Sequence, residues 1–484
     1  MKPTILWFRR DLRLDDNLAL EAAVRFQSPI IPMYVWGFED LGDRPLGERS
    51  AWWLQQSLMR LDLNLKIVGN RLTVITGNPL SALAEMVHRF DARAIFWNKI
   101  YEPDIIKLDQ SVRDKFIKTG LKTHSFGGSS LWDPSQILSS ESRPFRRFNS
   151  FWKHVSGVPV FECIKPSPRL TRSPQMMVRN PDLANLKESW KMPRTKKLEQ
   201  LWIPGEIQAH KTLEGFVKTQ ITTYDTDRNI PAMDGGSKLS SHLHFGEISP
   251  HKVWKRVLTG TREGTGPKEF LRQLAWRDFA YYVMFHNPKI TKTSYQSKFD
   301  KFPWMQNSSG LELWKSGITG YPLVDAGMRE LEHTGFMHNR IRMVVASFLT
   351  KHLRIHWLEG VSHFEKKLVD ADLSNNLMGW QWVAGSGLDA SPYFRIFNPV
   401  LQGRRFDQQG QYVRQWVPEI SRLPDRWIHE PWKANSLDLK KAGVILGKTY
   451  PLPIVDHQTA RSEALFAYRS INKMRNDDLN SKLG

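Results

Sequence analysis

The segment from Asp370 to Pro399 brings together residue types that seldom meet in a purely structural stretch. Asp370, Asp372 and Asn376 form a polar run that leads directly into a glycine and two tryptophans, at positions 379, 380 and 382. Further glycines follow at positions 385 and 387. A glycine lets another group approach the backbone closely, which a large planar cofactor requires. The segment therefore predicts a cofactor site.

A second candidate site lies on a predicted helix that begins at Pro267 and contains FLRQLAWRDFAYY. Gln273 and Trp276 are three residues apart and share a face of that helix. An amide beside an indole suits a flat base, because the amide can hydrogen-bond the edge of the base while the ring stacks on its plane. A core helix with one buried tryptophan explains the same pattern equally well.

A third candidate is TGFMHNRIRMVVASFLTKHLRIHW, residues 334–357, where a helix is predicted over His338–His356. Asn339, Arg340 and Met343 crowd one end of this helix. If they are buried, Asn339 and Arg340 need hydrogen-bond partners, which a bound polar ligand would supply. The alternative is that both side chains point to solvent.

The stretch Gly235–Glu247, GGSKLSSHLHFGE, is rich in glycine and serine and leads towards a predicted helix. Its backbone N–H groups, its hydroxyls and Lys238 would suit a pyrophosphate. An ordinary polar loop is the alternative. Neither GxGxxG nor GxxxxGK[ST] follows the first predicted strand, so the dinucleotide and P-loop fingerprints are absent.

Length and charge narrow the class of protein. The chain has 484 residues, more than one hydrophobic core usually covers, so two or three domains are expected. Lys and Arg number 69 against 49 Asp and Glu, and the net charge of +20 favours a polyanionic partner, with nucleic acid as the first candidate. A basic protein kept soluble by its charge is the alternative.

The cysteine content and the apolar runs indicate the compartment. A single cysteine, Cys163, excludes an intrachain disulfide and a cysteine-based zinc site, and no metal site is predicted. The N-terminal apolar run is short and lacks a cleavage site, so it is typical of a strand rather than a signal peptide. No apolar run reaches membrane-spanning length. We therefore expect a cytoplasmic protein with no membrane partner.

The first 133 residues alternate short apolar runs with amphipathic helical patterns. This alternation predicts a doubly wound parallel α/β sheet, a fold that binds ligands at the carboxyl ends of its strands. The predicted strands are Thr4–Phe8, Ile30–Val35, Leu72–Thr76 and Ala94–Trp97, and the predicted helices are Leu18–Arg25, Ala51–Asn64 and Leu80–Phe90.

Residues 134–206 lose this periodicity and are rich in Pro, Ser, Arg and Lys. A stretch such as KPSPRLTRSPQ cannot hold a helix, so a long linker over the surface is predicted. Residues 207–484 are dominated by helical patterns and predict an all-α domain. Besides the helices already named, the patterns cover Leu213–Thr219, Pro250–Leu258, Pro267–Phe285, Gly310–Ser316, Pro322–Thr334, Val361–Leu368 and Ala460–Lys473.

These motifs, from WFRRDLRLDDN near the start to LPDRWIHEPW near the end, resemble those of the photolyase/cryptochrome family over essentially the whole chain. Several long motifs agree in order and spacing, and the bacterial photolyases for cyclobutane pyrimidine dimers are the most similar branch. The resemblance implies an α/β antenna domain (1–133), an interdomain linker (134–206) and a helical FAD-binding catalytic domain (207–484). These boundaries agree with those predicted from pattern alone.

In this family FAD lies folded inside the helical domain. The resemblance places Asn376 opposite flavin N5, where a neutral side chain lets the flavin hold a proton or an anionic reduced form. The other positions that match FAD contacts are Tyr224, Ser237, Lys238, Leu239 and Ser240 at the phosphate and ribose end, and Arg277, Arg340, Asp370 and Asp372 on the ring side.

Photolyases of the family flip a pyrimidine dimer out of UV-damaged DNA and split it with an electron from excited, reduced FAD. The positions that match the lesion pocket are Gln273, Trp276, Asn339, Arg340, Met343 and Trp382, with the two tryptophans flanking the dimer. Trp380, Trp357 and Trp304 match the family's electron-transfer chain, from nearest the flavin to nearest solvent.

One position departs from the pattern of photolyases that are specific for cyclobutane dimers. Gln273 stands where those enzymes usually carry glutamate, and it keeps the hydrogen-bonding shape but loses the charge. Glutamine also occurs there in the (6-4) photolyase and animal cryptochrome branch. Against that branch, the motif Met337-His338-Asn339-Arg340 lacks the histidine pair expected over a (6-4) lesion. The resemblance therefore still favours cyclobutane dimers.

A second pigment is expected on the α/β domain. Glu48, Trp52, Tyr101 and Glu102 resemble the branch that binds 5,10-methenyltetrahydrofolate as an antenna, and deazaflavin is the alternative.

The resemblance thus implies a monomeric photolyase that acts on UV-damaged DNA at the nucleoid. A signalling cryptochrome has the same fold and flavin, but plant and animal members usually carry a long C-terminal extension, whereas this chain ends about 30 residues after Leu452-Pro453. A non-photochemical nucleic-acid-binding protein would explain the charge but would leave the flavin-site residues without a role.

Overall fold

The computed structural model describes residues 1–37, 44–160, 196–389 and 394–480. The chain divides into two compact units. The first unit contains Met1–Tyr224, Ser237–Pro288 and Val369–Asp372, and the second contains Asp225–Gly236, Lys289–Leu368 and Leu373–Gly484. The predicted boundaries after residues 133 and 206 rest on sequence composition rather than on contacts, and they stay a prediction.

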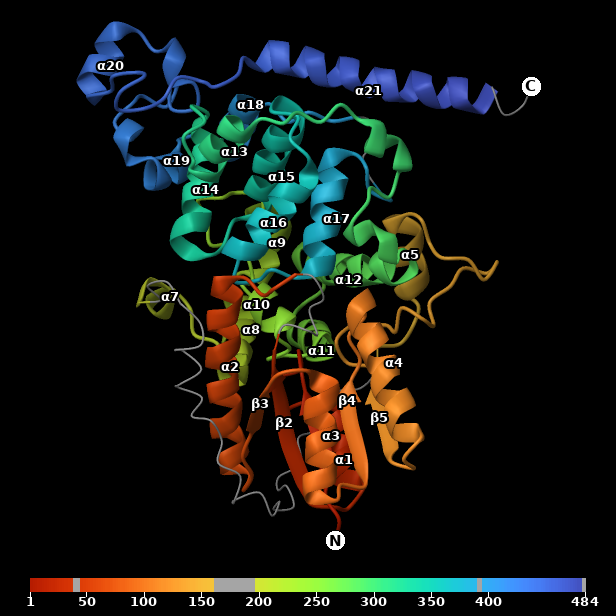
Figure 1. Ribbon diagram of the computed structural model, residues 1–484. Helices are drawn as coiled ribbons and strands as arrows, with labels where there is room; N and C mark the ends of the chain where they lie inside the picture. Colours follow the sequence, from red (N-terminus) through yellow and green to blue (C-terminus); the bar gives the residue numbers. More distant parts are fainter. Residues whose placement is uncertain (38–43, 161–195, 390–393, 481–484) are drawn as a thin grey trace. The chain divides into compact units, whose positions relative to one another are not determined.

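Five parallel strands form one sheet in the first unit, in the order β3-β2-β1-β4-β5 (Figure 1). Three of them, β1, β2 and β4, are buried along their whole length, which explains their continuous runs of aromatic and β-branched side chains. The predicted doubly wound parallel sheet is confirmed. The strands are β1 (Thr4–Phe8), β2 (Ile30–Trp36), β3 (Thr73–Thr76), β4 (Ala94–Asn98) and β5 (Lys122–Phe126).

The sequence patterns missed β5 and the helix before it, α4 (Pro103–Ile117). β5 has the sequence KTHSF, lies at the edge of the sheet and is only partly buried. An edge strand needs little apolar surface, so its polar residues gave no strand signal.

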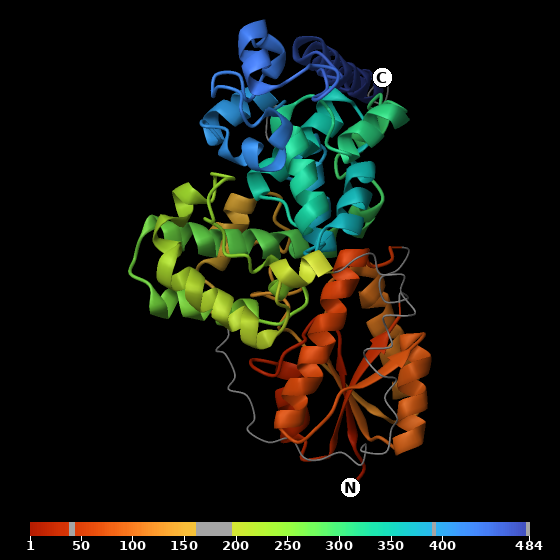
Figure 2. The ribbon, with the colours of Figure 1, turned by 90° about the vertical axis from the view of Figure 1, so that its left-hand side faces the viewer.

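Helices cover both faces of the sheet (Figures 1 and 2). On one face, α1 (Leu18–Arg25) and α2 (Glu48–Ile67) bury apolar side chains in a cluster with Leu6 of β1. On the other face, α3 (Pro79–Phe90) and α4 do so in a cluster with Trp7. Consecutive side chains of a strand point to opposite faces, so neighbouring β1 residues belong to different cores.

Polar side chains of the chain itself lie buried at the carboxyl ends of β1 and β4, where the strand order reverses. The Arg9 guanidinium contacts the Asp109 carboxylate at 2.7 Å, and Asn98 Nδ2 donates to Asp11 Oδ2 at 2.6 Å. Open α/β sheets usually bind ligands at this point. Here the side chains bond to one another, although the buried Arg9 Nε has no hydrogen-bond partner among the described residues.

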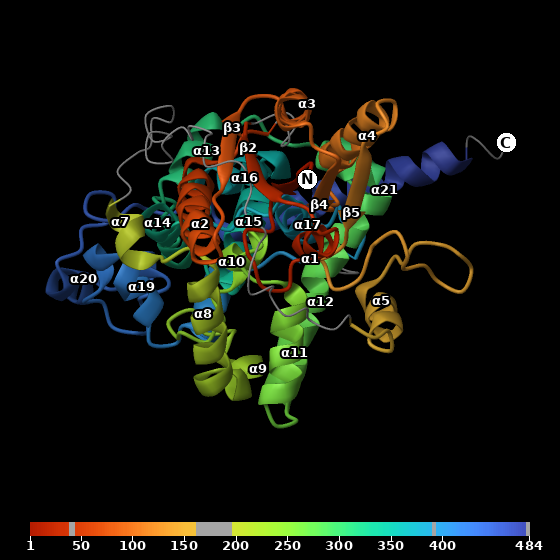
Figure 3. The same ribbon diagram turned by 90° about the horizontal axis from the view of Figure 1, so that it is seen from below.

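The predicted linker contains ordered structure in its first part. Residues 148–155 form α5 (Phe148–Val155), and Phe148, Phe151 and Val155 are buried, so this part is not a connector over the surface. The spacing of these three residues places them on one face of the helix, which packs beside α12 (Figures 1 and 3). The stretch KPSPRLTRSPQ and Cys163 lie outside the described residues.

The first unit also contains a helical layer that carries several predicted site residues. α11 begins with a proline in its first turn and with Ser249 as its cap, whose hydroxyl accepts from the Lys252 N–H at 2.9 Å. α11 packs along α12 (Figure 3). The helices are α7 (Lys196–Leu201), α8 (Glu206–Thr219), α10 (Ser240–His244), α11 (Pro250–Gly260) and α12 (Thr265–His286), and α9 (Tyr224–Asp227) crosses into the second unit.

Within its described residues, the second unit is built from helices. The predicted α14 agrees with the structure at both ends, because Pro322 suits its first turn and Gly335 ends it in the left-handed conformation, with φ of 72°. The helices are α13 (Ser308–Lys315), α14 (Pro322–Thr334), α15 (Asn339–Ser347), α16 (Trp357–Lys367), α17 (Leu373–Ala384), α18 (Pro399–Phe406), α19 (Gln411–Trp416), α20 (Ser436–Ala442) and α21 (His457–Asn480).

The helix predicted over His338–His356 is confirmed over Asn339–His352, but it is not a single α-helix and it ends earlier than predicted. α15 ends at Ser347, one π-helical turn follows over Phe348–His352, and the chain then breaks before α16. Arg354 has a φ of +50° inside this break, a conformation that interrupts a helix. After this break, Trp357 is the first residue of a new helix.

In the described ranges of the chain, no helix is long and apolar enough to cross a membrane. The same ranges contain no group of three or more His, Cys, Asp or Glu side chains that could hold a metal ion.

Candidate functional site

Helix α12 positions three of the predicted site residues in the first unit. Gln273, Trp276 and Arg277 lie within about one turn, and all three are only partly buried although their neighbours Leu274 and Ala275 lie in the core. This helix therefore presents an amide, an indole and a guanidinium along one partly open side.

Trp276 rests on an aromatic neighbour that the sequence analysis did not single out. Its indole stacks on the ring of Phe148 with centroids 3.6 Å apart and an angle of 12° between the planes. Phe148 is fully buried and belongs to α5, inside the predicted linker. One face of the indole is thus covered, and a stacking partner such as a base would have to use the other face.

Gln273 is held by a second residue of α12. Its Nε2 donates to Oε1 of Glu269, one helical turn earlier, at 2.7 Å. Glu269 also lies 3.7 Å from the guanidinium of Arg272, which in turn donates to Asn149 Oδ1 at 3.1 Å. These contacts fix the orientation of the Gln273 amide.

Arg277 is the centre of a polar network in the first unit. Its Nη1 donates to the carbonyl oxygen of Ser129 at 3.0 Å and lies 3.3 Å from Asp278 Oδ1. Its Nη2 donates to the carbonyl oxygen of Leu243 and to the hydroxyl oxygen of Tyr281, both at 3.4 Å. The guanidinium thus joins α12 to the end of α10 and to the chain after β5.

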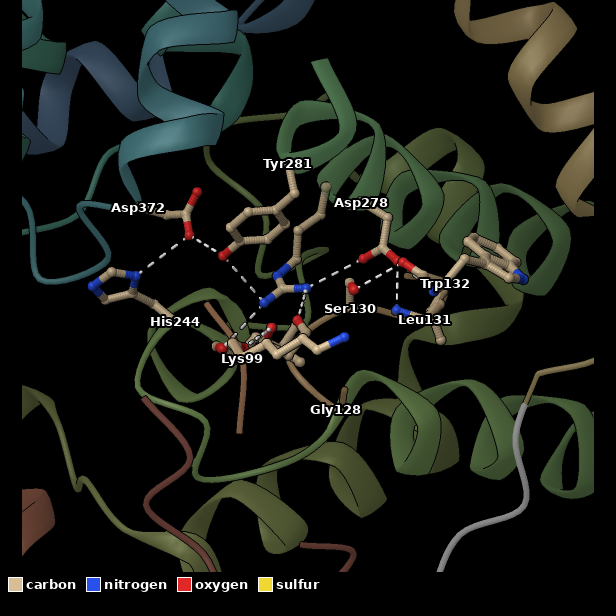
Figure 4. A network of polar contacts seen from close by, with 12 residues as sticks. Lys99, Gly128, Ser130, Leu131, Trp132, His244, Asp278, Tyr281 and Asp372 are labelled. Carbon is tan, nitrogen blue, oxygen red and sulfur yellow. Dashed lines mark hydrogen bonds and ion pairs between the residues drawn. The ribbon is translucent and has the colours of Figure 1, made fainter. Parts of the chain in front are cut away.

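Asp372, a predicted ring-side residue, joins the same network. Its carboxylate accepts from the Tyr281 hydroxyl and lies 3.5 Å from His244 Nδ1 (Figure 4). Burial alone would raise the pKa of Asp372, but its contacts with His244, Arg277 and Tyr281 hold that pKa well below its usual range. The carboxylate is therefore a fixed negative charge in the first unit. The structure brings together Arg277 and Asp372, two of the predicted flavin residues.

Asp278 closes the network on the opposite side. Its carboxylate accepts from the backbone N–H groups of Leu131 and Trp132 (Figure 4). Burial raises the pKa of Asp278 to about 7, against the opposite effects of Arg277 and the two N–H groups. No sequence motif singles out Asp278, because its partners are backbone groups far away in the chain.

The residues predicted at the phosphate and ribose end lie in two places. Tyr224 is the first residue of α9, and the others lie in the turn before α10 and at its first residue. Tyr224 is buried, with its ring edge-on to those of Phe216 and Phe270 at 5.6 and 5.2 Å. Lys238 is exposed and has a φ of +53°, in the left-handed region. The Ser237 hydroxyl accepts from the N–H of Leu239, which is buried, and Ser240 begins α10.

In the second unit, Arg340 belongs to a cluster of basic side chains at the start of α15. It donates to Asn229 Oδ1 and lies over the Phe406 ring at 4.3 Å, while its buried Nε has no partner among the described residues. Burial and the positive charges of Arg228 and Arg405 lower the pKa of Arg340. Gathered like charges of this kind favour an anion, which would relieve the repulsion.

The other residues predicted at this end of α15 are open to solvent to different degrees. Asn339 is exposed, and Met343 is half-buried, as is Trp382 on α17. For Asn339 the structure thus agrees with the alternative that its side chain points to solvent. Arg340 is bonded to Asn229 and lies over the Phe406 ring, but its buried Nε has no partner among the described residues.

Asn376 on α17 has a defined orientation. Its Nδ2 donates to the carbonyl oxygen of Val361 on α16 at 3.2 Å. Because a carbonyl can only accept, the amide nitrogen must face Val361, and Oδ1 is the amide atom left for another partner. Oδ1 can accept a hydrogen bond from a ligand.

Asp370, the other acid of the predicted run, is buried in the first unit. Gly379 is exposed on α17, and a Cβ there would meet nothing within 4 Å, so this face leaves room for a ligand.

Trp380 packs edge-on against Trp314 and Phe364, with ring centroids 6.1 and 5.0 Å apart. It also touches α16 at Gly360, where a Cβ would lie only 2.1 Å from Trp380 Cη2. Gly360 lies three residues after Trp357 and so on the same side of the helix. The glycine therefore lets Trp380 approach the helix that Trp357 begins.

The remaining two predicted tryptophans both lie near the ring of one histidine, His356. Trp357 is fully buried, Trp304 is half-buried, and the His356 ring lies 5.4 Å from the first and 5.0 Å from the second. The indole nitrogens of Trp357 and Trp380 have no hydrogen-bond partner among the described residues. The sequence analysis missed His356 and Gly360, which carried no chemical signal of their own.

The four residues predicted for the antenna take part in two different sets of contacts. Trp52 is buried in the core between the sheet and α2, and Glu48 is exposed at the start of that helix. Tyr101 is buried edge-on to Phe285 at 6.2 Å, and burial raises its pKa above its usual value. Glu102 forms a buried ion pair with Arg10. The assignment of these residues to an antenna stays a prediction.

Glu247 is a buried hub that the sequence analysis quoted only as the end of a polar stretch. Its carboxylate accepts from Trp53 Nε1 at 3.1 Å, from the Gly205 N–H at 2.7 Å and from the Ser57 hydroxyl, and it contacts His242 Nδ1. These partners come from α2, from the residue before α8 and from α10. Glu247 thus ties α2 to α10 and to the residue before α8.

The comparisons with known proteins agree with this architecture. Two family models match the chain: DNA photolyase over residues 4–170, and the FAD binding domain of DNA photolyase over residues 270–470. The chain is 41% identical over 478 residues to a deoxyribodipyrimidine photo-lyase of Agrobacterium fabrum, covering 97% of this chain and 98% of that protein. It is 38% identical over 475 residues to Cryptochrome-2 of Arabidopsis thaliana, covering 95% and 78%.

The structure is also similar to the crystal structure of a bacterial class III photolyase from Agrobacterium tumefaciens. The TM-score is 0.94 at 42% sequence identity, with 98% of each chain covered. The chain therefore belongs to the photolyase/cryptochrome family, and it contains that family's FAD-binding domain.

Proposed function

We propose that this protein is a light-driven DNA-repair enzyme that splits cyclobutane pyrimidine dimers. FAD, when bound, would supply the photoexcited electron donor, and the residues of the chain would bind the lesion, hold the flavin and exclude water. The relatives named above are consistent with this activity, and the finer assignment rests on residues of this chain.

The observation that carries the proposal is the side of α12 formed by Gln273 and Trp276. Trp276 is backed by Phe148 on one face, so it offers a rigid platform for stacking by a base that has left the duplex. Gln273 lies one turn away with its amide fixed. Stacking on a plane together with hydrogen bonding at an edge is how a single flipped base is recognised.

Residues in each unit fit a flavin. In the second unit, Oδ1 of Asn376 remains as an acceptor, which suits a proton held at flavin N5. The unpartnered Nε of Arg340, within a basic cluster, suits an anionic group. In the first unit, the Arg277–Tyr281–Asp372 network is preorganised and would keep its geometry when the cofactor binds.

The tryptophans of the second unit support a route for refilling an oxidised flavin. We propose Trp380, Trp357 and Trp304 in that order, since Trp380 and Trp357 are buried and Trp304, at the end of the series, is half-buried. The His356 ring lies near both of the last two rings. A folate antenna, with deazaflavin as the alternative, action in the cytoplasm and a monomeric state remain parts of this proposal.

The test is repair of defined lesions by protein loaded with FAD and chemically reduced. An oligonucleotide with one cis-syn thymine dimer should be restored under blue light and not in the dark, and a matched (6-4) lesion should not be restored. Asn339→Ala should reduce repair roughly tenfold, because one base contact of about 1–3 kcal/mol is lost. Asn472→Ala on α21, far along the chain from these residues, is the matched control and should leave repair unchanged.

Two results would change the proposal. Protein that cannot be loaded with FAD would refute it entirely. Normal photoreduction without repair of either lesion would favour a blue-light signalling cryptochrome, the function suggested by the similarity to Cryptochrome-2 of Arabidopsis thaliana.

A further inference from the structure

The hydrogen bond between Glu269 and Gln273 determines which atom of the Gln273 amide remains available. The two residues are four apart on α12, and the bond joins Gln273 Nε2 to Glu269 Oε1 at 2.7 Å. A carboxylate can only accept hydrogen bonds, whereas an amide has one accepting oxygen and one donating NH₂. The amide nitrogen must therefore face Glu269, and the amide oxygen must face away from it.

This assignment does not depend on which way the amide is drawn. A flipped amide would place its oxygen against a carboxylate oxygen, two acceptors at 2.7 Å with no proton between them. Arg272, 3.7 Å from the Glu269 carboxylate, stabilises the negative charge there. Among the described residues, the structure gives Gln273 Oε1 no protein partner.

We propose that Glu269 is a positioning residue that makes Gln273 an obligatory acceptor and so selects bases whose ring N3 carries a proton. This inference rests on the proposed function, in which Gln273 contacts a base of the flipped dimer. The thymine edge offers N3–H as a donor, even after its 5,6 double bond has been consumed in the cyclobutane ring. The 5-methylcytosine edge has the same shape, but its donor is the exocyclic N4–H₂ and its ring N3 is an acceptor, which an amide oxygen facing N3 would repel.

The proposal also explains how a glutamine can serve where related enzymes usually carry glutamate. A carboxylate at position 273 would be an acceptor by itself. An amide becomes an acceptor only when a second group occupies its NH₂, and Glu269 is that group. Gln273 Oε1 therefore acts as the acceptor that a carboxylate would provide at this position. The negative charge lies instead on Glu269, one turn earlier in the helix.

The test compares two lesions of equal shape in binding to FAD-loaded protein in the dark. One duplex carries a cis-syn thymine dimer, the second a freshly prepared dimer of two 5-methylcytosines, and a third is undamaged. We expect the parent protein to prefer the thymine dimer about tenfold over the 5-methylcytosine dimer, the discrimination typical of one good edge contact. Glu269→Gln frees the amide at 273 to turn, and the preference should fall to about twofold or less.

The double variant Glu269→Gln/Gln273→Glu is the decisive arm. It reverses the pair, so that the introduced amide donates to an introduced carboxylate, whose other oxygen remains as an acceptor. The preference should return to about tenfold. A residue that only stabilised α12 would give no such recovery. Glu263→Gln removes an exposed carboxylate from the segment before α12 and controls for the change in charge towards DNA; it should keep the preference of the parent.

The outcomes separate the two levels of the proposal. Equal affinity of the parent for dimer-containing and undamaged DNA would overturn the proposed function and this inference together. Preference for dimers over undamaged DNA, but an unchanged thymine preference in Glu269→Gln or no recovery in the double variant, would overturn the inference alone.

Discussion

At the scale of single residues, Gly360 decides how closely Trp380 can approach the helix begun by Trp357. A methyl group at position 360 would lie 2.1 Å from Trp380 Cη2 and 2.4 Å from Cζ2, well inside contact distance. Trp380 is itself buried between Trp314 and Phe364, so it has little room to move away. The glycine is therefore required by packing rather than by backbone conformation.

We expect Gly360→Ala to destabilise the protein by about 1–3 kcal/mol through overpacking, which outweighs the roughly 1 kcal/mol that alanine adds to a helix. Displacement of Trp380 should also slow photoreduction of oxidised FAD several-fold, and Trp380→Phe should block photoreduction while leaving repair by chemically reduced protein nearly intact. Thermal unfolding and flavin absorbance under blue light measure the two effects.

Gly215 offers the matched control. It lies inside α8, is exposed, and a Cβ there would meet nothing within 4 Å. Gly215→Ala should slightly stabilise the protein and leave photoreduction unchanged. If Gly360→Ala behaved in the same way, the packing argument would be wrong.

At the scale of elements, two helices of the second unit begin at a histidine cap. His338 Nδ1 accepts from the N–H of Arg340 at the start of α15, and His356 Nδ1 accepts from the N–H of Leu358 at the start of α16, both at 3.2 Å. A ring nitrogen can accept only when it carries no proton. Both caps therefore require neutral imidazoles, and protonation would leave the helix N–H groups unpaired.

The His338 cap predicts a pH dependence of stability. Burial, with the positive charges of Arg340, Arg342 and Arg228, lowers the pKa of His338 to about 4. Above pH 6.5 neither the folded nor the unfolded form is protonated, and the stability is complete. As the pH falls from 6.5 to 4, the unfolded form gains a proton that the folded form does not, so stability is lost. Between pH 7.5 and 5 this loss should be about 1–2 kcal/mol.

The variant His338→Asn isolates this contribution, because asparagine caps a helix without titrating. The difference in unfolding free energy between the parent and the variant, followed by far-UV circular dichroism in urea, should change by about that amount over the same pH range. Parallel pH profiles for the two proteins would show that His338 does not carry the effect. The other histidines of the chain contribute equally to both proteins and cancel.

At the scale of the whole molecule, the net charge of +20 favours binding to a polyanion and makes the affinity depend on salt. Part of that charge is concentrated near the start of α15, where Arg228, Arg340 and Arg405 are close enough to lower the pKa of Arg340. A surface that neutralises DNA phosphates releases condensed cations, so the affinity for DNA falls as salt rises.

We expect the affinity for dimer-containing DNA to fall roughly 10³-fold or more between 50 and 200 mM salt if at least six phosphates are contacted. Arg405→Gln, at an exposed position of α18 beside this cluster, should reduce the slope of log affinity against log salt by about one. Lys107→Gln on α4 removes an equally exposed charge from the sheet domain and should leave the slope unchanged. Fluorescence anisotropy over a salt series measures both; equal slopes for all three proteins would contradict the role of the cluster.

Local pattern was sufficient where a residue's environment follows from its neighbours in sequence. β1 and β2 can be recognised as continuous apolar runs because both of their faces are buried. α14 can be recognised by the proline in its first turn and the glycine after its last turn. The family motifs then predicted the FAD-binding domain. The pattern failed at α5, whose buried face is three aromatic or aliphatic residues within a polar segment, and at the edge strand β5.

The sequence by itself therefore determined the parallel sheet apart from β5, many of the helices and the family, because these depend on periodicity and on long ordered motifs. Only the tertiary structure decided how the site residues are held. Phe148 covers one face of Trp276, the Val361 carbonyl orients Asn376, and the contact with Glu269 orients Gln273. The physical reason is that a hydrogen bond or a stacked ring depends on direction and distance, and these are fixed by packing between segments and by side-chain rotamers rather than by spacing along the chain.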